Sequence, residues 1–439
     1  MIKNPSLRAI FALLVLLSFL RPVVAQEKPL RALGGGFARE IALGAGAAYS
    51  PTHPYNFNPF LRNDTYLLIN PAYIGDFGNY VWGNFDGTQT GATSQTFAGA
   101  NFEALTNLYL GLLVNTRDAL ATTGQLNDYA GQRLPNIENA LGFLIGYKLS
   151  PELTLGAQIY TGAQTFEAKL QPAGAQASDT TRQMSVLGFD VGAVYNSAQW
   201  RGELAIKVRM NSRLERSRST TTAEVSLDGG MELGANGRVF YKLSDAYDLV
   251  PTFSFYNVSI GTKVAPAPPA NAEKVDVSQT AFEVGLGLNA KTKNALIIGG
   301  VSFAQSTIET KTTNLGNAAG NSRTETDQTT LLPRINLGAE LYPLSWLTAR
   351  VGYFKTLASN QVVVEQRIGG NVSKVTQTTN GLTFANYLGD HIAAGVGLRF
   401  SEWTMDFALN KDFLRNGPHA LGGVATSPLF FVFSSSYRF

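Results

Sequence analysis

The chain has 439 residues, of which 44% are hydrophobic and only 15% are charged, and it contains no cysteine. The absence of cysteine excludes disulfides, thiolate metal sites and a cysteine nucleophile. Soluble domains usually carry about 25% charged residues, so the composition favours a membrane protein. Beyond the first 25 residues no run of 18 apolar residues occurs, which excludes an ordinary transmembrane helix and leaves a transmembrane β-barrel as the predicted class.

Residues 1–25 are typical of a secretory signal peptide. Lys3 and Arg8 precede an apolar run, Arg21 and Pro22 end it, and small residues follow up to Ala25. Removing this segment takes away three basic residues and no acidic one, which leaves 32 residues of each sign. A neutral mature chain has no basic stripe for nucleic acid, so no nucleic-acid partner is expected.

Residues 26–72 do not alternate between apolar and polar positions. Three consecutive glycines occur at 34–36, and prolines at 51, 54 and 59 follow. Two interpretations remain open for this segment. It forms a disordered periplasmic tail, or it folds into the barrel as a plug or hatch, since a barrel of 14–16 strands is wide enough to need a filling.

The same segment resembles the start of the FadL-type outer-membrane hydrocarbon and long-chain fatty-acid transporters and of the related PorV-type barrels. The resemblance rests on RALGGGFA at 31–38 and NDTYLLINPAYI at 63–74. Asp64 matches an acidic position, and Asn70, Pro71 and Ala72 match an Asn-Pro-Ala element that enters the barrel; residues 39–62 look inserted. The resemblance implies a 14-strand barrel, an N-terminal hatch and diffusion of hydrophobic molecules through a kinked strand of the wall.

Residues 73–439 alternate with a period of two, which is the pattern of β-strands with one apolar face. In WRGELAIKVRM, residues 200–210, one parity is mainly apolar and the other holds the charges. We predict an antiparallel transmembrane barrel of 14–16 strands. The sixteen candidate strands lie near 79–87, 95–103, 106–115, 139–149, 153–163, 184–195, 200–211, 230–243, 248–261, 280–290, 294–305, 329–342, 346–356, 390–400, 403–410 and 428–439.

The predicted connections alternate in length. Tight turns are expected near 150–152, 196–199, 244–247, 291–294, 343–345 and 401–402. Long polar loops are expected near 116–138, 163–183, 211–228, 263–278, 306–327, 357–389 and 411–427. Short turns on one side and long loops on the other are typical of outer-membrane barrels, where the short turns face the periplasm.

The inward parity carries charges of both signs. Two roles remain open for them: a ring that tunes a pore, or pairs that link neighbouring strands or hold the hatch. Several glycines share this parity and leave room in the lumen, among them Gly142, Gly146, Gly188, Gly192, Gly285, Gly287, Gly338, Gly395 and Gly397. The charged candidates are Arg201, Glu203, Lys207, Arg209, Arg334, Glu340, Arg350, Arg399 and Asp406.

The last strand carries aromatics at alternating positions, Phe431, Phe433, Tyr437 and Phe439. Aromatics on the outer face of a barrel sit at the membrane interface. A terminal Phe preceded by such aromatics also resembles the signal that the bacterial barrel-assembly machinery reads. We therefore expect outer-membrane lipid and that machinery to be partners.

No pattern indicates an enzyme. His53, His391 and His419 are far apart and lack metal-ligand spacing. Asp390 and His391 are adjacent, and adjacent strand residues point to opposite faces. No catalytic residue, metal or cofactor is therefore expected.

Passive transport of small hydrophobic molecules across the bacterial outer membrane is the leading hypothesis. A diffusion porin for polar solutes is the first alternative, and it predicts an open, charge-lined pore. A scaffold or secretion-system partner barrel, with its long loops as the working surface, is the second.

Overall fold

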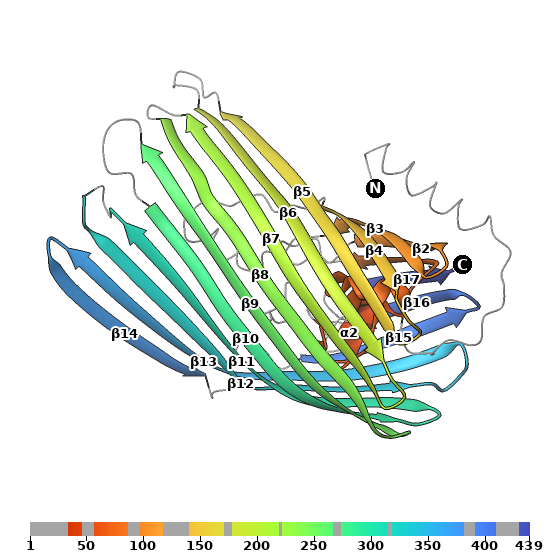
Figure 1. Ribbon diagram of the computed structural model, residues 1–439. Coiled ribbons are helices and arrows are strands. Elements are labelled where there is room, and N and C mark those ends of the chain that lie inside the picture. The colour runs from red at the N-terminus through yellow and green to blue at the C-terminus, as the bar shows by residue number, and fades with distance from the viewer. Residues whose placement is uncertain are drawn as a thin grey trace, which may run out of the picture.

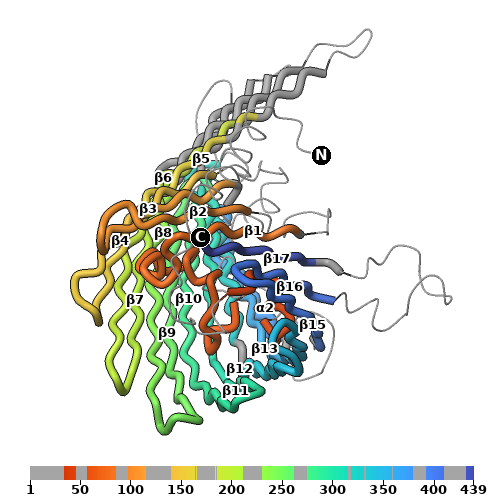
Figure 2. The backbone as a smooth tube through the Cα atoms, turned by 90° about the vertical axis from the view of Figure 1, so that its right-hand side faces the viewer, coloured from red at the N-terminus to blue at the C-terminus, as the bar shows by residue number. Residues whose placement is uncertain are grey.

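The structure is a computed structural model that describes residues 34–45, 57–86, 97–116, 140–170, 178–218, 222–266, 274–314, 318–381, 391–409 and 430–439. The expected signal peptide lies outside these residues. The described strands form one antiparallel sheet that closes on itself, because the first strand pairs with both the second and the last (Figures 1 and 2).

Seventeen strands occupy sixteen positions around the barrel. Strands β14 and β15 both pair with the same edge of β13, β14 along residues 358–368 and β15 along residues 347–354. The predicted antiparallel barrel of 14–16 strands is therefore confirmed. The strands are β1 (Tyr80–Asp86), β2 (Phe97–Leu105), β3 (Leu108–Thr116), β4 (Ala140–Lys148), β5 (Leu153–Leu170), β6 (Ser178–Asn196), β7 (Trp200–Arg218), β8 (Thr222–Ser244), β9 (Tyr247–Pro266), β10 (Lys274–Lys291), β11 (Ala295–Thr313), β12 (Ser322–Leu341), β13 (Leu347–Ile368), β14 (Asn371–Gly381), β15 (His391–Phe400), β16 (Trp403–Leu409) and β17 (Phe430–Arg438).

The wall of the barrel is much taller on one side than on the other. Strand β8 has 23 residues and β13 has 22, whereas β1 and β16 have 7 each. At about 3.3 Å per residue, a strand of this longer kind runs for roughly 70 Å. Figure 1 shows the long strands β5 to β13 rising well past the ends of the short ones.

The prediction of long loops was wrong on the tall side. Residues near 163–170, 211–218, 222–228, 306–313 and 357–368 continue their strands instead of leaving them. The physical reason is that polar side chains occur on both faces of these extensions and their few apolar residues do not alternate. Without an apolar face they lack the alternation that marks a strand, although Thr and Val in them favour extended backbone.

An apolar belt surrounds the end of the barrel at which the short turns lie, here called the tight-turn end. In β7 the exposed large hydrophobic side chains lie between Trp200 and Met210, and in β10 they lie between Phe282 and Leu288. The far end of β10 instead exposes a Lys274–Asp276 ion pair, with an N–O distance of 3.1 Å. A belt of about ten residues on tilted strands matches the roughly 25 Å apolar band of membrane barrels.

Aromatic pairs brace the outer face along the strands that close the barrel. Trp403 and Tyr437 have ring centroids 4.8 Å apart, and Phe433 stacks with Phe85 at 5.9 Å across the pair that closes the barrel. Phe439 continues the row, with its ring centroid 6.5 Å from that of Tyr437. The side chain of Phe431 lies outside the described part. The assembly role of these aromatics stays a prediction.

The described N-terminal residues, 34–45 and 57–79, form a lumenal segment inside the ring of strands (Figure 2). It contains α2 (Gly36–Ala42) and two short 3-10 helices, η1 (Asp64–Leu68) and η2 (Pro71–Gly75). Helix α2 contacts β1, β13, β15, β16 and β17, and η2 contacts β3 to β6. In the part of the chain that the structure describes, no helix combines the length and the apolar character that a membrane span requires.

A charged substitution should destabilise the barrel in the apolar belt but not in the strand extensions. Val284 lies in the belt and Val375 lies on β14, and both side chains are exposed. We expect Val284→Arg to lower the free energy of unfolding by about 2–4 kcal/mol, because the guanidinium enters the hydrocarbon. The matched control Val375→Arg should have little effect. Urea titrations of the refolded barrel in liposomes measure both; equal losses would contradict the position of the belt.

Candidate lumenal site

Inward glycines form the hollows that receive the lumenal segment. A Cβ on Gly287 would overlap the Phe60 ring, whose Cγ would be only 2.7 Å away, and a Cβ on Gly338 would lie 2.8 Å from the Leu43 carbonyl oxygen. These distances are shorter than any normal Cβ contact. The same holds for Gly146 against Ile74, Gly156 against Pro71 and Ala72, Gly192 against Asn70, and Gly395 against Ala42.

Asp64 ties the glycine run to the wall. Its carboxylate accepts hydrogen bonds from the backbone N–H of Gly35 at 3.3 Å, from that of Gly36 at 2.9 Å, and from the Tyr80 hydroxyl at 2.6 Å. Gly35 and Gly36 have φ of 143° and 56°, values that favour glycine and turn both N–H groups toward one acceptor. Burial raises the pKa of Asp64, while the three donors oppose that shift. The acidic residue Asp64 and the glycine run therefore hydrogen-bond directly to each other.

The segment also crosses the seam where the barrel closes. The backbone N–H of Ala38 donates to the Ser434 hydroxyl of β17 at 3.0 Å, and that hydroxyl contacts Asn84 of β1 at 2.5 Å. Strands β1 and β17 are thus held by backbone pairing and by contacts to the same helix, α2.

One buried ion-pair cluster joins α2 to the wall. Arg39 donates through Nε to Glu340 at 2.9 Å, and Arg350 donates through Nε to the same carboxylate at 2.5 Å. Arg350 also pairs with Asp406. All four side chains are buried, so each charge depends on its partners instead of on water.

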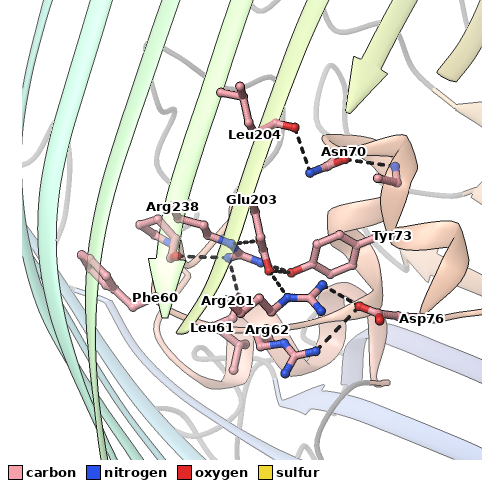
Figure 3. A network of polar contacts seen from close by, with 12 residues as sticks. Phe60, Leu61, Arg62, Asn70, Tyr73, Asp76, Arg201, Glu203, Leu204 and Arg238 are labelled. Atoms are coloured by element: carbon pink, nitrogen blue, oxygen red, sulfur yellow. Dashed lines mark hydrogen bonds and ion pairs between the residues drawn. The ribbon is translucent and has the colours of Figure 1, made fainter. Parts of the chain in front are cut away.

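A second cluster centres on Glu203 (Figure 3). This carboxylate accepts from Arg201 Nε at 2.5 Å, from Arg238 Nε at 2.5 Å and from the Tyr73 hydroxyl at 2.6 Å. Arg238 also donates to the carbonyl oxygen of Leu61 at 2.7 Å. A single acidic residue of β7 thereby fixes η2 and the chain before η1.

The Asn-Pro-Ala element has a local structural role. Asn70 caps η2, because its side-chain oxygen accepts from the N–H of Ala72 at 3.0 Å. Its side-chain nitrogen donates to the carbonyl oxygens of Ala193 and Leu204, each at 3.2 Å. Pro71 occupies the first helical position, where no N–H is needed.

The other predicted lumenal charges also lie on the inner side. Lys207 donates to the Leu68 carbonyl oxygen at 2.7 Å, and Arg209 pairs with Asp190 at 2.9 Å. Arg334 pairs with Glu283 at 3.3 Å. The side chain of Arg399, near the end of β15, is half-buried.

Sequence reasoning missed several members of these clusters. Arg39 lies outside any strand, and Arg238 lies in β8. Its parity was nevertheless readable, because Glu232, Asn236 and Arg238 alternate with outward residues along β8.

An apolar patch lines the inner face of the barrel. It lies farther from the tight-turn end than the charged clusters do. Tyr160 of β5 and Val186 of β6 are buried there, with Tyr256, Val258 and Ile260 of β9. These residues share a parity with the polar residues below them, so the lumen changes from polar to apolar along its length.

No group of three or more His, Asp or Glu with metal-binding geometry occurs among the described residues. His391 is the first residue of β15, while His53 and His419 fall on residues that the structure does not describe.

Removing the negative charge of Glu340 should destabilise the barrel strongly. We expect Glu340→Gln to lower the free energy of unfolding by about 3 kcal/mol, because Arg39 and Arg350 then share no carboxylate. The control is Glu365→Gln, whose ion pair with Arg367 is exposed and contributes about 0–1 kcal/mol. Urea unfolding measures both variants, and equal effects would rule out an anchoring role for Glu340.

Glu40 predicts a pH dependence of the segment. Its carboxylate accepts from Asn58 N–H and the Thr65 hydroxyl, each at 2.9 Å, while burial raises its pKa to about 7. The folded state therefore holds this proton more tightly than the unfolded state. Its contribution to stability is greatest in acid and falls as pH rises from about 4.5 to about 7.

The measurement is the free energy of unfolding between pH 5 and pH 8 for the unchanged chain and for Glu40→Gln. The variant should lose the part of the slope that Glu40 causes, since an amide does not titrate. Parallel pH profiles for the two proteins would contradict this assignment.

Comparison with known proteins gives only distant matches. No family model and no curated protein matches this chain. Among solved structures, the toluene transporter TodX of Pseudomonas putida is 12% identical, with 94% of this chain and all of that chain covered and a TM-score of 0.38. The toluene transporter TbuX of Ralstonia pickettii is 12% identical, with 93% and 99% covered and a TM-score of 0.35. The ferric yersiniabactin receptor FyuA of Yersinia pestis is 9% identical, with 82% and 79% covered and a TM-score of 0.35. Similarity at this level assigns neither a function nor a ligand to this chain.

Proposed function

We propose that this protein is an outer-membrane channel that passes small hydrophobic molecules by diffusion, with the lumenal segment as its hatch. The closed barrel and its apolar belt support the membrane location, since a belt of this height fits a bilayer. The tight-turn end then faces the periplasm, and the tall wall extends outside the cell.

The observation that carries the proposal is the burial of the lumenal segment against the wall. Phe60 and Tyr73 are fully buried, and α2 is buried along its whole length. A segment held this way obstructs the path of water and of polar solutes at the level of the belt.

The distribution of side chains in the lumen supports a hydrophobic cargo. The inner patch around Tyr160, Tyr256 and Val258 is a buried apolar cluster on the outer side of the hatch. The charges nearer the periplasm are bound to the segment or to each other, as for Arg238 with Glu203. A porin for polar solutes would need such charges free along an open path, so the geometry favours the hatched channel.

One observation favours a second function, a scaffold for a partner protein. The β13–β14 hairpin stands beyond the belt and exposes Ile368, Val372 and Val375. Exposed apolar side chains on a two-stranded ribbon are suited to contact with another protein. If the barrel passes neither hydrophobic nor polar solutes, the scaffold function is favoured.

The experiment uses the refolded chain in liposomes, with entry of toluene and of arabinose measured in parallel. We expect toluene to reach an enclosed reporter enzyme faster in liposomes that contain the barrel than in protein-free liposomes. Arabinose should enter both kinds of liposome at the same rate. Rapid arabinose entry would contradict the hatch and identify a porin, and entry of neither would contradict transport.

A further inference from the structure

A cavity of about 440 Å³ opens at the tight-turn end beside the lumenal segment. Leu61 and Arg62 of the segment line one side of it, and the ends of strands β6 to β12 line the other. This exit cavity borders the anchoring clusters: Arg39 and Arg201 line it, while the carboxylates Glu203 and Glu340 do not. Its volume is in the range of sites for small molecules, roughly 300–1,000 Å³.

The apolar part of the exit cavity is aromatic. Phe240 is buried in a cluster with Leu61, and Leu296 packs against that cluster. Tyr342, just past the end of β12, contributes a second ring. Flat rings of this kind pack well against a small aromatic ligand.

The charges that line the exit cavity are mostly positive. Arg39, Arg62, Arg201, Lys242 and Lys291 face a single carboxylate, Asp248. Three of these cations are already neutralised, since Arg39 pairs with a glutamate of β12, Arg201 with one of β7, and Lys291 with Asp248.

The other two cations leave a positive surplus. Arg62 reaches Asp76 only at 3.7 Å, and that carboxylate is held more closely by Arg201 at 2.5 Å. Lys242 forms no ion pair with any residue that the structure describes. The cavity thus combines an aromatic floor with two cations that an anion could neutralise.

We propose that the exit cavity binds a compact aromatic monoanion, such as an aryl carboxylate. Its ring packs on Phe240 and Tyr342, and its carboxylate is attracted to Lys242 and Arg62. This binding site does not depend on transport through the barrel, because equilibrium binding tests it without any passage of cargo.

The test is a ligand-observed fluorine NMR titration of the refolded full chain in nonionic detergent, with empty micelles as the baseline. The probes are 4-fluorophenylacetate and 2-(4-fluorophenyl)ethanol, which share the ring and differ in charge. We expect the carboxylate to bind about tenfold more tightly than the alcohol, and its affinity to fall as salt rises.

Variants locate the site. Lys242→Gln combined with Arg62→Gln should weaken carboxylate binding about tenfold, and Leu296→Trp should abolish it by filling the cavity. Lys293→Gln, in the neighbouring turn but outside the lining, is the matched control and should bind as the unchanged chain does. Equal binding of acid and alcohol, or full binding by the Lys242→Gln and Arg62→Gln protein, would overturn the proposal.

Discussion

Two buried glutamates of the wall anchor the lumenal segment, and each takes a group of that segment into its ion-pair cluster. Glu203 and Glu340 each accept from two arginines. A carboxylate removed from water is costly unless such donors surround it. Arg39 of the segment is one of the two donors to Glu340, while the segment's Tyr73 donates to Glu203 and its Asp76 pairs with Arg201. Docking of the segment therefore completes both buried ion-pair clusters.

Glycine makes that docking possible on the wall side. Where the backbone of the segment comes closest, as at Gly338 beside Leu43, any side chain on the wall would collide with it. The belt lies at the same height along the strands as these contacts. Beyond it the tall wall is mainly polar on its outer side, apart from the apolar side chains of the β13–β14 hairpin. The segment and the belt thus lie at the same level of the barrel.

Much of the barrel could be predicted from the sequence, because period-two alternation marks most of the strands in the apolar belt. The inward parity of Arg201 and Glu203 followed from the same rule. The strand extensions could not be predicted in this way, since polar residues on both faces interrupt the alternation. The partner of Glu340 was also hidden, because Arg39 lies about 300 positions earlier in a segment without periodicity. The resemblance placed Asp64 near the glycine run but did not reveal that one hydrogen-bonds to the other.

The most direct test of the central claim is ion conductance across a planar bilayer, compared between the whole chain and a variant that lacks residues 26–66. The account predicts a closed whole chain and a large, steady conductance for the shortened one. The full-length variant Arg39→Ser with Arg238→Ser loosens the segment without deleting it, and it should open intermittently. Equal conductance in all three proteins would contradict the claim that the segment closes the lumen.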